Sequence, residues 1–155
     1  MILSKTTGYG IRALGYMANR GGDTPCSLQE IADREEIPPI YLQKILGQLR
    51  RHRLLRSVRG IGGGYEFEQP PETITLWEIF RVLEPDPYLE GCIIGHGTCH
   101  ERAEGHCGLH EPWVRMREEL IEVLKSTTVA QVAGSIPATL PVSPVPPSTI
   151  TGQPS

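Results

Sequence analysis

Residues 27–51 read SLQEIADREEIPPIYLQKILGQLRR, and this segment predicts two short helices separated by a tight turn. Ser27 and Glu30 match a capping box, in which each side chain bonds the other residue's backbone N–H. The prolines at 38 and 39 are suited to the start of the next helix. Four apolar residues of that helix share one face at helical spacing: Leu42, Ile45, Leu46 and Leu49. This pattern is typical of a helix-turn-helix.

The flanking segments complete a winged version of this motif. Residues 4–19 predict a preceding helix, because apolar residues recur there at helical spacing. Residues 55–58 and 65–68 are strand-like, and the glycine-rich run at 59–64 can join them as a hairpin. The expected fold class is therefore mainly α with a small β-hairpin wing: a winged helix-turn-helix followed by a long dimerisation helix.

A long helix is expected from Glu111 to about Lys125, after a shorter helix opened by a capping box at Thr75 and Glu78. Its apolar residues form two stripes: Trp113, Met116, Leu120 and Val123, then Val114 and Ile121. A helix this apolar predicts a homodimer seam, although packing on the chain's own core is an alternative and both uses can coexist. Residues 1–70 are then a DNA-binding domain, residues 71–132 a loop with dimerisation helices, and residues 133–155 a disordered proline-rich tail.

The charge is concentrated where the second helix of the motif lies. The 155-residue chain has a net charge of -3, which excludes a uniformly basic nucleic-acid binder but allows a basic patch. Residues 39–60 contain no acidic residue and six basic ones: Lys44, Arg50, Arg51, Arg53, Arg56 and Arg59. Such a one-signed run favours phosphate contacts over a solvated helix face, which usually carries both signs.

The candidate DNA-binding residues lie on that helix and on the wing. They are Tyr41, Gln43, Lys44, Gln48, Arg51, Arg59, Gly62 and Gly63. Gln can bond an adenine edge, Lys and Arg can bond guanine or phosphate, and Arg59 suits either a narrow minor groove or a phosphate. Gly47 weakens its helix, so we expect it to permit close approach of either a DNA backbone or the first helix.

Soft metal ligands gather between residues 92 and 110. Three of the four cysteines and four of the five histidines fall there. The predicted ligands are Cys92, Cys99, Cys107 and His110, and the other three histidines are rivals for the fourth place: His96, His100 and His106. Thiolates with imidazole indicate an iron–sulfur cluster or zinc. A structural zinc site usually has closely paired ligands, so the long gaps here fit zinc poorly. Regulatory thiols without a metal are a further alternative.

Several functions are excluded or disfavoured by what the sequence lacks. No apolar run has transmembrane length and the N-terminus does not resemble a secretory signal, so we expect a cytoplasmic protein without membrane contact. Neither a nucleophile–base–acid constellation nor a phosphate-binding loop is visible, so an enzyme is not expected.

These motifs together resemble the Rrf-type winged-helix transcriptional regulators, typified by the IscR- and NsrR-like iron–sulfur regulators. The similarity spans Met1 to about Val132 and includes residues 37–38, 41–46 and 59–65, with the three cysteines in order. It implies a homodimer on a near-palindromic double-stranded DNA operator, which senses iron, cluster status or nitric oxide.

The resemblance also bears on the cluster. The segment from Cys107 to His110 is similar to the Cys-x-x-His that supplies the last two ligands in IscR-like members, and Gly8 stands where NsrR-like members carry an acidic ligand. This favours a 2Fe–2S cluster, with 4Fe–4S as the alternative.

The function expected from these observations is that of a DNA-binding transcriptional repressor whose operator binding is controlled by an iron–sulfur cluster. A small iron–sulfur electron carrier, and a zinc-binding or metal-free regulator, are the alternatives.

Overall fold

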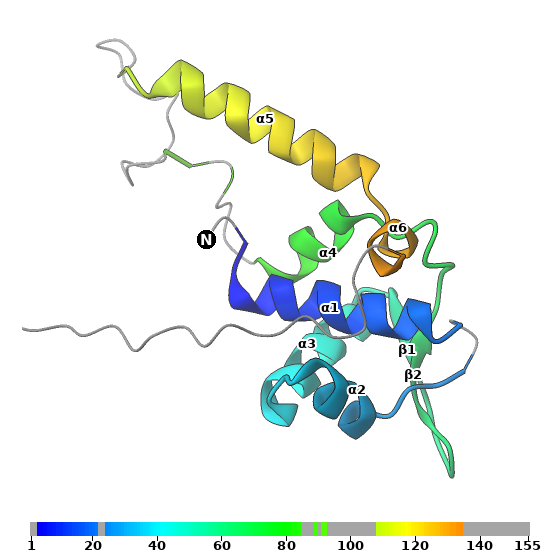
Figure 1. Ribbon diagram of the computed structural model, residues 1–155. Coiled ribbons are helices and arrows are strands. Elements are labelled where there is room, and N and C mark those ends of the chain that lie inside the picture. The colour runs from blue at the N-terminus through cyan, green and yellow to red at the C-terminus, as the bar shows by residue number, and fades with distance from the viewer. Residues whose placement is uncertain (1–2, 22–23, 85–88, 90, 93–107, 135–155) are drawn as a thin grey trace, which may run out of the picture.

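The computed structural model of the protein describes residues 3–21, 24–84, 89, 91–92 and 108–134. The described part is mostly helical with one two-stranded sheet, which confirms the expected fold class (Figure 1). Its elements in chain order are α1 (Lys5–Asn19), α2 (Leu28–Glu35), α3 (Pro39–Arg51), β1 (Leu55–Val58), β2 (Gly64–Phe67), α4 (Leu76–Leu83), α5 (His110–Ser126) and α6 (Val129–Ala133).

Side-chain caps fix where the helices begin. Ser4 caps α1, and Ser27 caps α2 by accepting a hydrogen bond from the backbone N–H of Glu30. Only this half of the expected capping box at α2 is seen, because the Glu30 carboxylate accepts from the Tyr16 hydroxyl and pairs with Arg20 instead. The box at Thr75 and α4 forms completely.

Two residues other than glycine adopt left-handed backbone conformations at the ends of the helices of the helix-turn-helix, and the sequence did not predict them. Glu36 adopts a left-handed conformation with a φ of 51° between α2 and α3, and Ile37 beside it is buried. Arg53 likewise has a φ of 59°, which ends α3 with the geometry that glycine usually provides. The N–H of Leu54 then reaches the Leu49 carbonyl, so the chain turns directly from α3 into β1.

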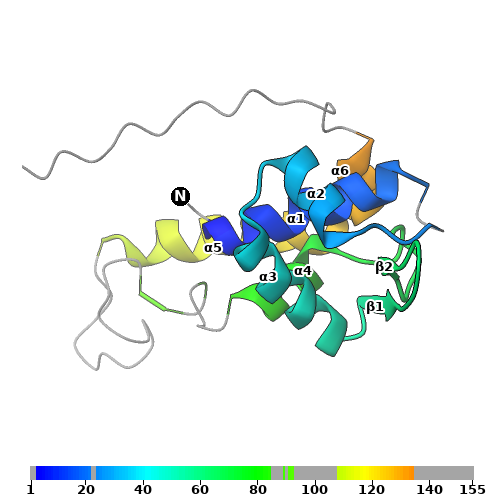
Figure 2. The same ribbon diagram turned by 90° about the horizontal axis from the view of Figure 1, so that it is seen from below.

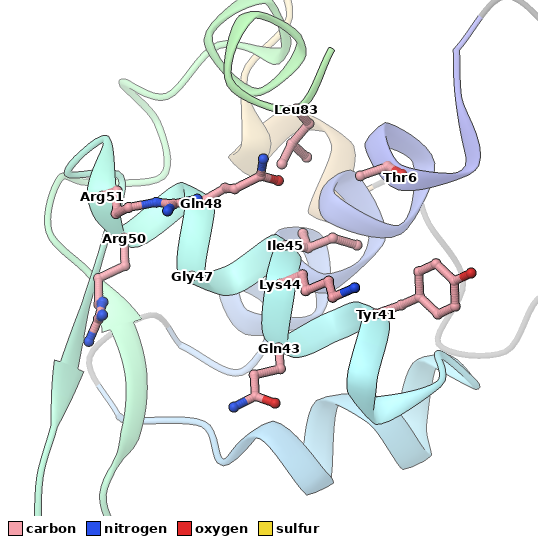
Figure 3. Close-up of a pocket in the computed structure, with 10 residues that line it drawn as sticks. All are labelled: Thr6, Tyr41, Gln43, Lys44, Ile45, Gly47, Gln48, Arg50, Arg51 and Leu83. Carbon is pink, nitrogen blue, oxygen red and sulfur yellow. The ribbon is translucent and has the colours of Figure 1, made fainter. Parts of the chain in front are cut away.

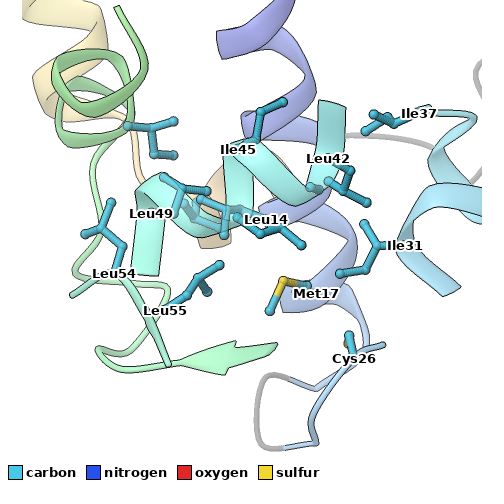
Figure 4. Close-up of a cluster of buried hydrophobic side chains, with 14 of the residues drawn as sticks. Leu14, Met17, Cys26, Ile31, Ile37, Leu42, Ile45, Leu49, Leu54 and Leu55 are labelled. Carbon is cyan, nitrogen blue, oxygen red and sulfur yellow. The ribbon is translucent and has the colours of Figure 1, made fainter. Parts of the chain in front are cut away.

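One core lies between α1 and the helix-turn-helix (Figure 4). The apolar face predicted for α3 points into it, and Leu42, Leu46 and Leu49 are fully buried. Leu14 from α1 and Leu55 from β1 pack against them. Burying a side chain of this size contributes about 1.5–3 kcal/mol, so these contacts fix the orientation of α3.

The wing is anchored to the segment before α2. Strands β1 and β2 pair antiparallel with Leu55 opposite Phe67 and Val58 opposite Gly64. Cys26 adds a bridge on the outer edge of β2, exchanging two backbone hydrogen bonds of 2.8 Å with Tyr65. A Cβ on Gly64 would lie 2.2 Å from the Cys26 carbonyl oxygen, so only glycine permits this approach.

Helix α5 lies on the far side of α1 and α4 from α3 (Figure 1). It packs on α4 through a second small core around Phe80, Leu89 and Leu124. Leu124 is its only buried residue. The chain then returns through α6, which packs against α1 and was not predicted. The expected disordered tail falls almost entirely on residues 135–155, outside the described residues.

Candidate nucleic-acid interface

The outward face of α3 combines four residues that the helix brings into one line. Ile40, Lys44, Gly47 and Arg51 follow each other at intervals of four, three and four residues, which is the spacing of one helix face. Ile40, Lys44 and Arg51 are exposed, because the opposite side of α3 is buried in the core. The face is thus free to contact another molecule along its whole length.

A groove of about 660 Å³ runs along one side of this face (Figure 3). Thr6 from α1 and Tyr41 lie at one end of it, whereas Arg50 and Arg51 lie at the other end beside the hairpin. Gln43, Lys44 and Gln48 line it between these ends. Five of the eight predicted DNA-binding residues therefore share one surface with polar donors and cations.

Most of the predicted basic run keeps its charge available. Arg56 does not, since its Nε lies 2.6 Å from a carboxylate oxygen of Glu66, the residue opposite it in the hairpin. Arg50 donates a hydrogen bond to the Ser57 hydroxyl at 3.4 Å and links α3 to β1. Within the part of the chain that the structure describes, no ion pair involves Lys44, Arg51 or Arg59.

The wing loop carries the other three predicted residues. Arg59 is exposed, and Gly62 has a φ of 78°, a conformation that favours glycine. A Cβ on Gly63 would lie 2.3 Å from the Val58 carbonyl oxygen. The loop geometry itself thus requires glycine at 62 and 63. Figure 2 views the molecule from the side on which α3 and the hairpin both lie.

The geometry also decides between the two explanations for Gly47. Apart from its chain neighbours and the backbone of α3 itself, no atom of the described residues lies within 4 Å of the place a Cβ would take at Gly47. Packing against α1 therefore does not require a glycine there. Access from outside is the explanation that remains, and it suits close approach of a nucleic-acid backbone.

The predicted ligands of the metal centre are only partly described. Cys99 and Cys107 lie outside the described residues, and among those described no three Cys, His, Asp or Glu side chains gather as a metal site. Cys92 is half-buried, and His110 is the first residue of α5. The Trp113 indole Nε1 donates a 2.9 Å hydrogen bond to the Gly91 carbonyl, which holds the residue before Cys92 against the first turn of α5. The described donors, a thiol and an imidazole near one helix end, fit a cluster or zinc by chemistry.

One carboxylate joins the end of α4 to the start of α1. Glu84 Oε1 accepts hydrogen bonds from the Ser4 N–H at 3.1 Å and from the Thr7 hydroxyl at 2.5 Å. Burial opposes ionisation of Glu84, but the hydrogen bonds from Ser4 and Thr7 outweigh it and lower the pKa of this carboxyl. The contact ties Glu84 to α1, the helix that also supplies Thr6 to the groove.

A second polar cluster lies near the anchor of the wing. The Glu30 carboxylate accepts from the Tyr16 hydroxyl at 2.7 Å and pairs with Arg20. Burial raises the pKa of the Tyr16 hydroxyl, and its hydrogen bond to Glu30 adds to the rise. Arg20 Nη1 also lies 3.4 Å from the Cys26 sulfur, so this cluster braces α1 against the segment that pairs with β2.

A buried helix-turn-helix with an accessible, basic second helix and a hairpin beside it defines a winged-helix DNA-binding protein. Comparison with known proteins identifies the family. The chain belongs to the Rrf2 family, whose model, described as an iron-dependent transcriptional regulator, matches residues 3–135. The resemblance found in the sequence is thereby confirmed, and the protein is a helix-turn-helix transcriptional regulator.

Individual relatives agree with this assignment. The chain is 34% identical over 137 residues to the regulator CymR of Bacillus subtilis, which covers 86% of this chain and 90% of the relative. A structure of CymR, described as the global cysteine regulator of B. subtilis, matches with a TM-score of 0.73 at 30% identity, covering 87% of this chain and 98% of that one. The structure of T. potens IscR matches with a TM-score of 0.69 at 28% identity, covering 86% of both chains. These relatives are regulators and not enzymes.

Three residues of the candidate nucleic-acid interface were not among the predicted DNA-binding residues: Thr6, Arg50 and Ile40. Thr6 comes from α1 and reaches the groove only through the packing of two helices, so no local pattern signals it. Arg50 lines the groove, and the sequence predicted it only as a member of the basic run. Ile40 was detectable, because it is a large apolar residue out of phase with the buried face of α3.

No helix among the described segments is long and apolar enough to cross a membrane.

Proposed function

We propose that this Rrf2-family regulator binds a double-stranded DNA operator as a homodimeric repressor, and that an iron–sulfur cluster controls the binding. The observation that supports DNA binding is the outward face of α3, where Lys44 and Arg51 are exposed beside the wing. The absence of acidic residues from 39–60 keeps this surface attractive to phosphates. In this proposal residues 1–70 form the DNA-binding unit and residues 71–132 the control and dimerisation unit.

Each predicted contact residue has a role that suits its chemistry. Gln43 and Gln48 bond adenine edges, while Lys44 and Arg51 bond guanine or phosphate. Tyr41 contacts the DNA backbone from the end of the groove beside Thr6. Arg59 enters the minor groove or bonds a phosphate, and Gly62 and Gly63 allow the tight wing loop that presents Arg59 to the DNA.

Helix α5 supports the homodimer. Met116 and Val123 are 47% and 57% exposed and lie seven residues apart on one side of the helix. Apolar side chains at this interval pack well against an identical helix. A second copy of α5 is therefore the partner that covers them.

Cys92, Cys99, Cys107 and His110 would hold the cluster, with 2Fe–2S favoured by this ligand set, 4Fe–4S as the alternative and zinc as the weaker fit. A bound iron–sulfur cluster supplies redox chemistry and a ligation state that depends on the iron supply. The Trp113 hydrogen bond to the Gly91 carbonyl holds residues 91–92 against the first turn of α5, which begins at His110, so both ends of the proposed ligand segment lie near this helix. Glu84, which ends α4, accepts a hydrogen bond from Thr7 and so links the end of α4 to α1.

Duplex binding is tested by fluorescence anisotropy with a labelled random-sequence duplex over a series of salt concentrations. We expect log K to fall linearly with log salt, with a slope of about -0.9 per phosphate contact. Binding that is absent, or that does not depend on salt, would contradict the proposed function and would favour the electron-carrier alternative.

Cluster binding is tested by anaerobic purification with iron, sulfide and zinc analysis and visible spectroscopy. We expect iron and sulfide in the wild type, and a Cys99→Ala variant that has lost the visible absorption band. Cys26→Ala is the matched control, because Cys26 is a buried thiol beside the wing and not a predicted ligand. A colourless wild type that contains zinc would establish the zinc alternative.

A regulator without a cluster is the second candidate. It is favoured by the identity to CymR, which at 34% exceeds the 27% identity to IscR of Sodalis glossinidius. CymR is described as a cysteine regulator, so a sulfur compound would then replace the cluster as the signal. A wild type that contains neither iron nor zinc but binds DNA would support this candidate.

A further inference from the structure

The large apolar side chains that the described residues leave exposed fall into two sets. Leu109, Met116 and Val123 lie on α5 and directly before it, and the proposed dimer covers this helix. The other set belongs to the candidate nucleic-acid interface: Ile40, Tyr41 and Ile61. No polar contact role accounts for the two isoleucines of this second set, which lie on the recognition helix and on the wing.

Ile40 is placed where a recognition helix meets bases. It is the second residue of α3, and the N-terminal residues of such a helix contact base edges in the major groove. Its side chain is 71% exposed, whereas Ile37 and Leu42 on either side are buried at 1% and 0%. Ile40 thus takes no part in the core and shares the outward line of Lys44, Gly47 and Arg51.

The neighbours of Ile40 determine which apolar group it can meet. Lys44 and Arg51 attract phosphates to this line, and the open space at Gly47 allows DNA to approach the helix. The one apolar group on the edges of bases in the major groove is the C5-methyl of thymine. We propose that Ile40 recognises this methyl group and makes thymine the preferred base at one position of each operator half-site. The inference rests on the proposed DNA binding.

Ile61 provides a matched control within the same protein. It is fully exposed at the tip of the wing, between Gly60 and Gly62, which both have positive φ. A wing that lies in the minor groove meets no methyl group, because the thymine methyl projects only into the major groove. Substitution of Ile61 can therefore weaken binding without changing the response to the methyl group.

The test removes the methyl group and nothing else. A duplex is first selected from a random library with the wild-type protein, and each thymine is then replaced singly by deoxyuridine. For the wild type we expect about a fourfold loss of affinity at one symmetric pair of positions, the effect of burying one methyl-sized group. Ile40→Ala should lose this discrimination, while Ile61→Ala should retain it.

The outcomes separate the inference from the function on which it rests. If the wild type binds no duplex, both fail. If it binds tightly but no deoxyuridine substitution changes its affinity, or if Ile40→Ala discriminates as the wild type does, DNA binding stands and the role of Ile40 is overturned. Because Ile40 is outside the core, Ile40→Ala should keep the unfolding transition of the wild type, which circular dichroism checks.

Discussion

Helices α3 and α5 are both amphipathic, but the chain completes the burial of only one of them. Helix α3 has 13 residues and buries Leu42, Ile45, Leu46 and Leu49, so its apolar face is covered within the chain. Helix α5 is longer, with 17 residues, yet it buries only Leu124. Its exposed Met116 and Val123 are what a second copy would cover.

This difference separates two kinds of binding surface. The outward face of α3 carries the cations Lys44 and Arg51 beside the exposed Ile40, so it can bind and release a charged partner. The outward side of α5 retains apolar groups, which favours a lasting contact between like chains. Variants of the two helices should therefore affect different properties of the protein.

The largest effect should come from the buried side of α3. We expect Leu46→Ala to lower the free energy of unfolding by about 2–5 kcal/mol, because Leu46 is fully buried and its truncation leaves a cavity between the surrounding helices. Chemical denaturation measures this loss. Val123→Ala is the comparison on α5, and at low protein concentration it should change the free energy of unfolding by less than about 0.5 kcal/mol. Equal losses would show that both helices are core elements of one chain.

The exposed side of α5 should instead control self-association. We expect Met116→Asp with Val123→Asp to weaken the dimer by tenfold or more, because each places a charge in an apolar contact. Sedimentation equilibrium over a range of concentrations measures the dissociation constant. Glu122→Ala, an exposed position on another side of α5, should leave it unchanged. A wild type that stays monomeric at all concentrations would remove the basis of the comparison.

The outward face of α3 should respond through salt dependence. We expect Lys44→Ala to reduce the slope of log K against log salt by about 0.9, the loss of one phosphate contact. Lys125→Ala removes the same charge from α5, where the ammonium lies 5.6 Å from the Trp77 ring, and should leave the slope unchanged. Equal changes for both variants would indicate that only net charge matters.

Local signals in the sequence predicted most of the elements because their causes are local. The apolar period of α3, the cap at Thr75 and the glycine-rich wing loop depend on residues only a few positions apart. The left-handed Arg53 was not predicted, since its conformation is imposed by the turn into β1 and not by its side chain.

Contacts between distant segments could not be read in this way. The count of charges from 39 to 60 did not include Glu66, because this residue lies further along the chain. The register of the hairpin places Glu66 opposite Arg56, and the two side chains form an ion pair. Helix α6 was missed because five residues give little periodicity, and it is stabilised by packing on α1. The carboxylate of Glu84 meets Thr7 across 77 positions of sequence, and only the packing of α4 on α1 brings them together.

That contact between Glu84 and Thr7 gives the smallest expected effect, and it joins α4, on which α5 packs, to α1, which packs on α3. The folded-state pKa of Glu84 is lowered, so the stabilisation is complete above its unfolded pKa and is lost as the pH falls through the folded value. We expect Glu84→Gln to lower the free energy of unfolding near neutral pH by about 0.3–1 kcal/mol, the range for a carboxylate at a helix N-terminus.

Denaturation of both proteins across a pH series measures this effect. The difference in the free energy of unfolding between wild type and Glu84→Gln should shrink as the pH falls below the ordinary pKa range of glutamate. The wild-type carboxyl is then protonated and therefore uncharged, as the Gln amide is at every pH. Glu72→Gln is the control, since Glu72 is exposed and precedes α4. A difference that stays constant with pH would mean that the shape of the side chain, and not its charge, joins α4 to the start of α1.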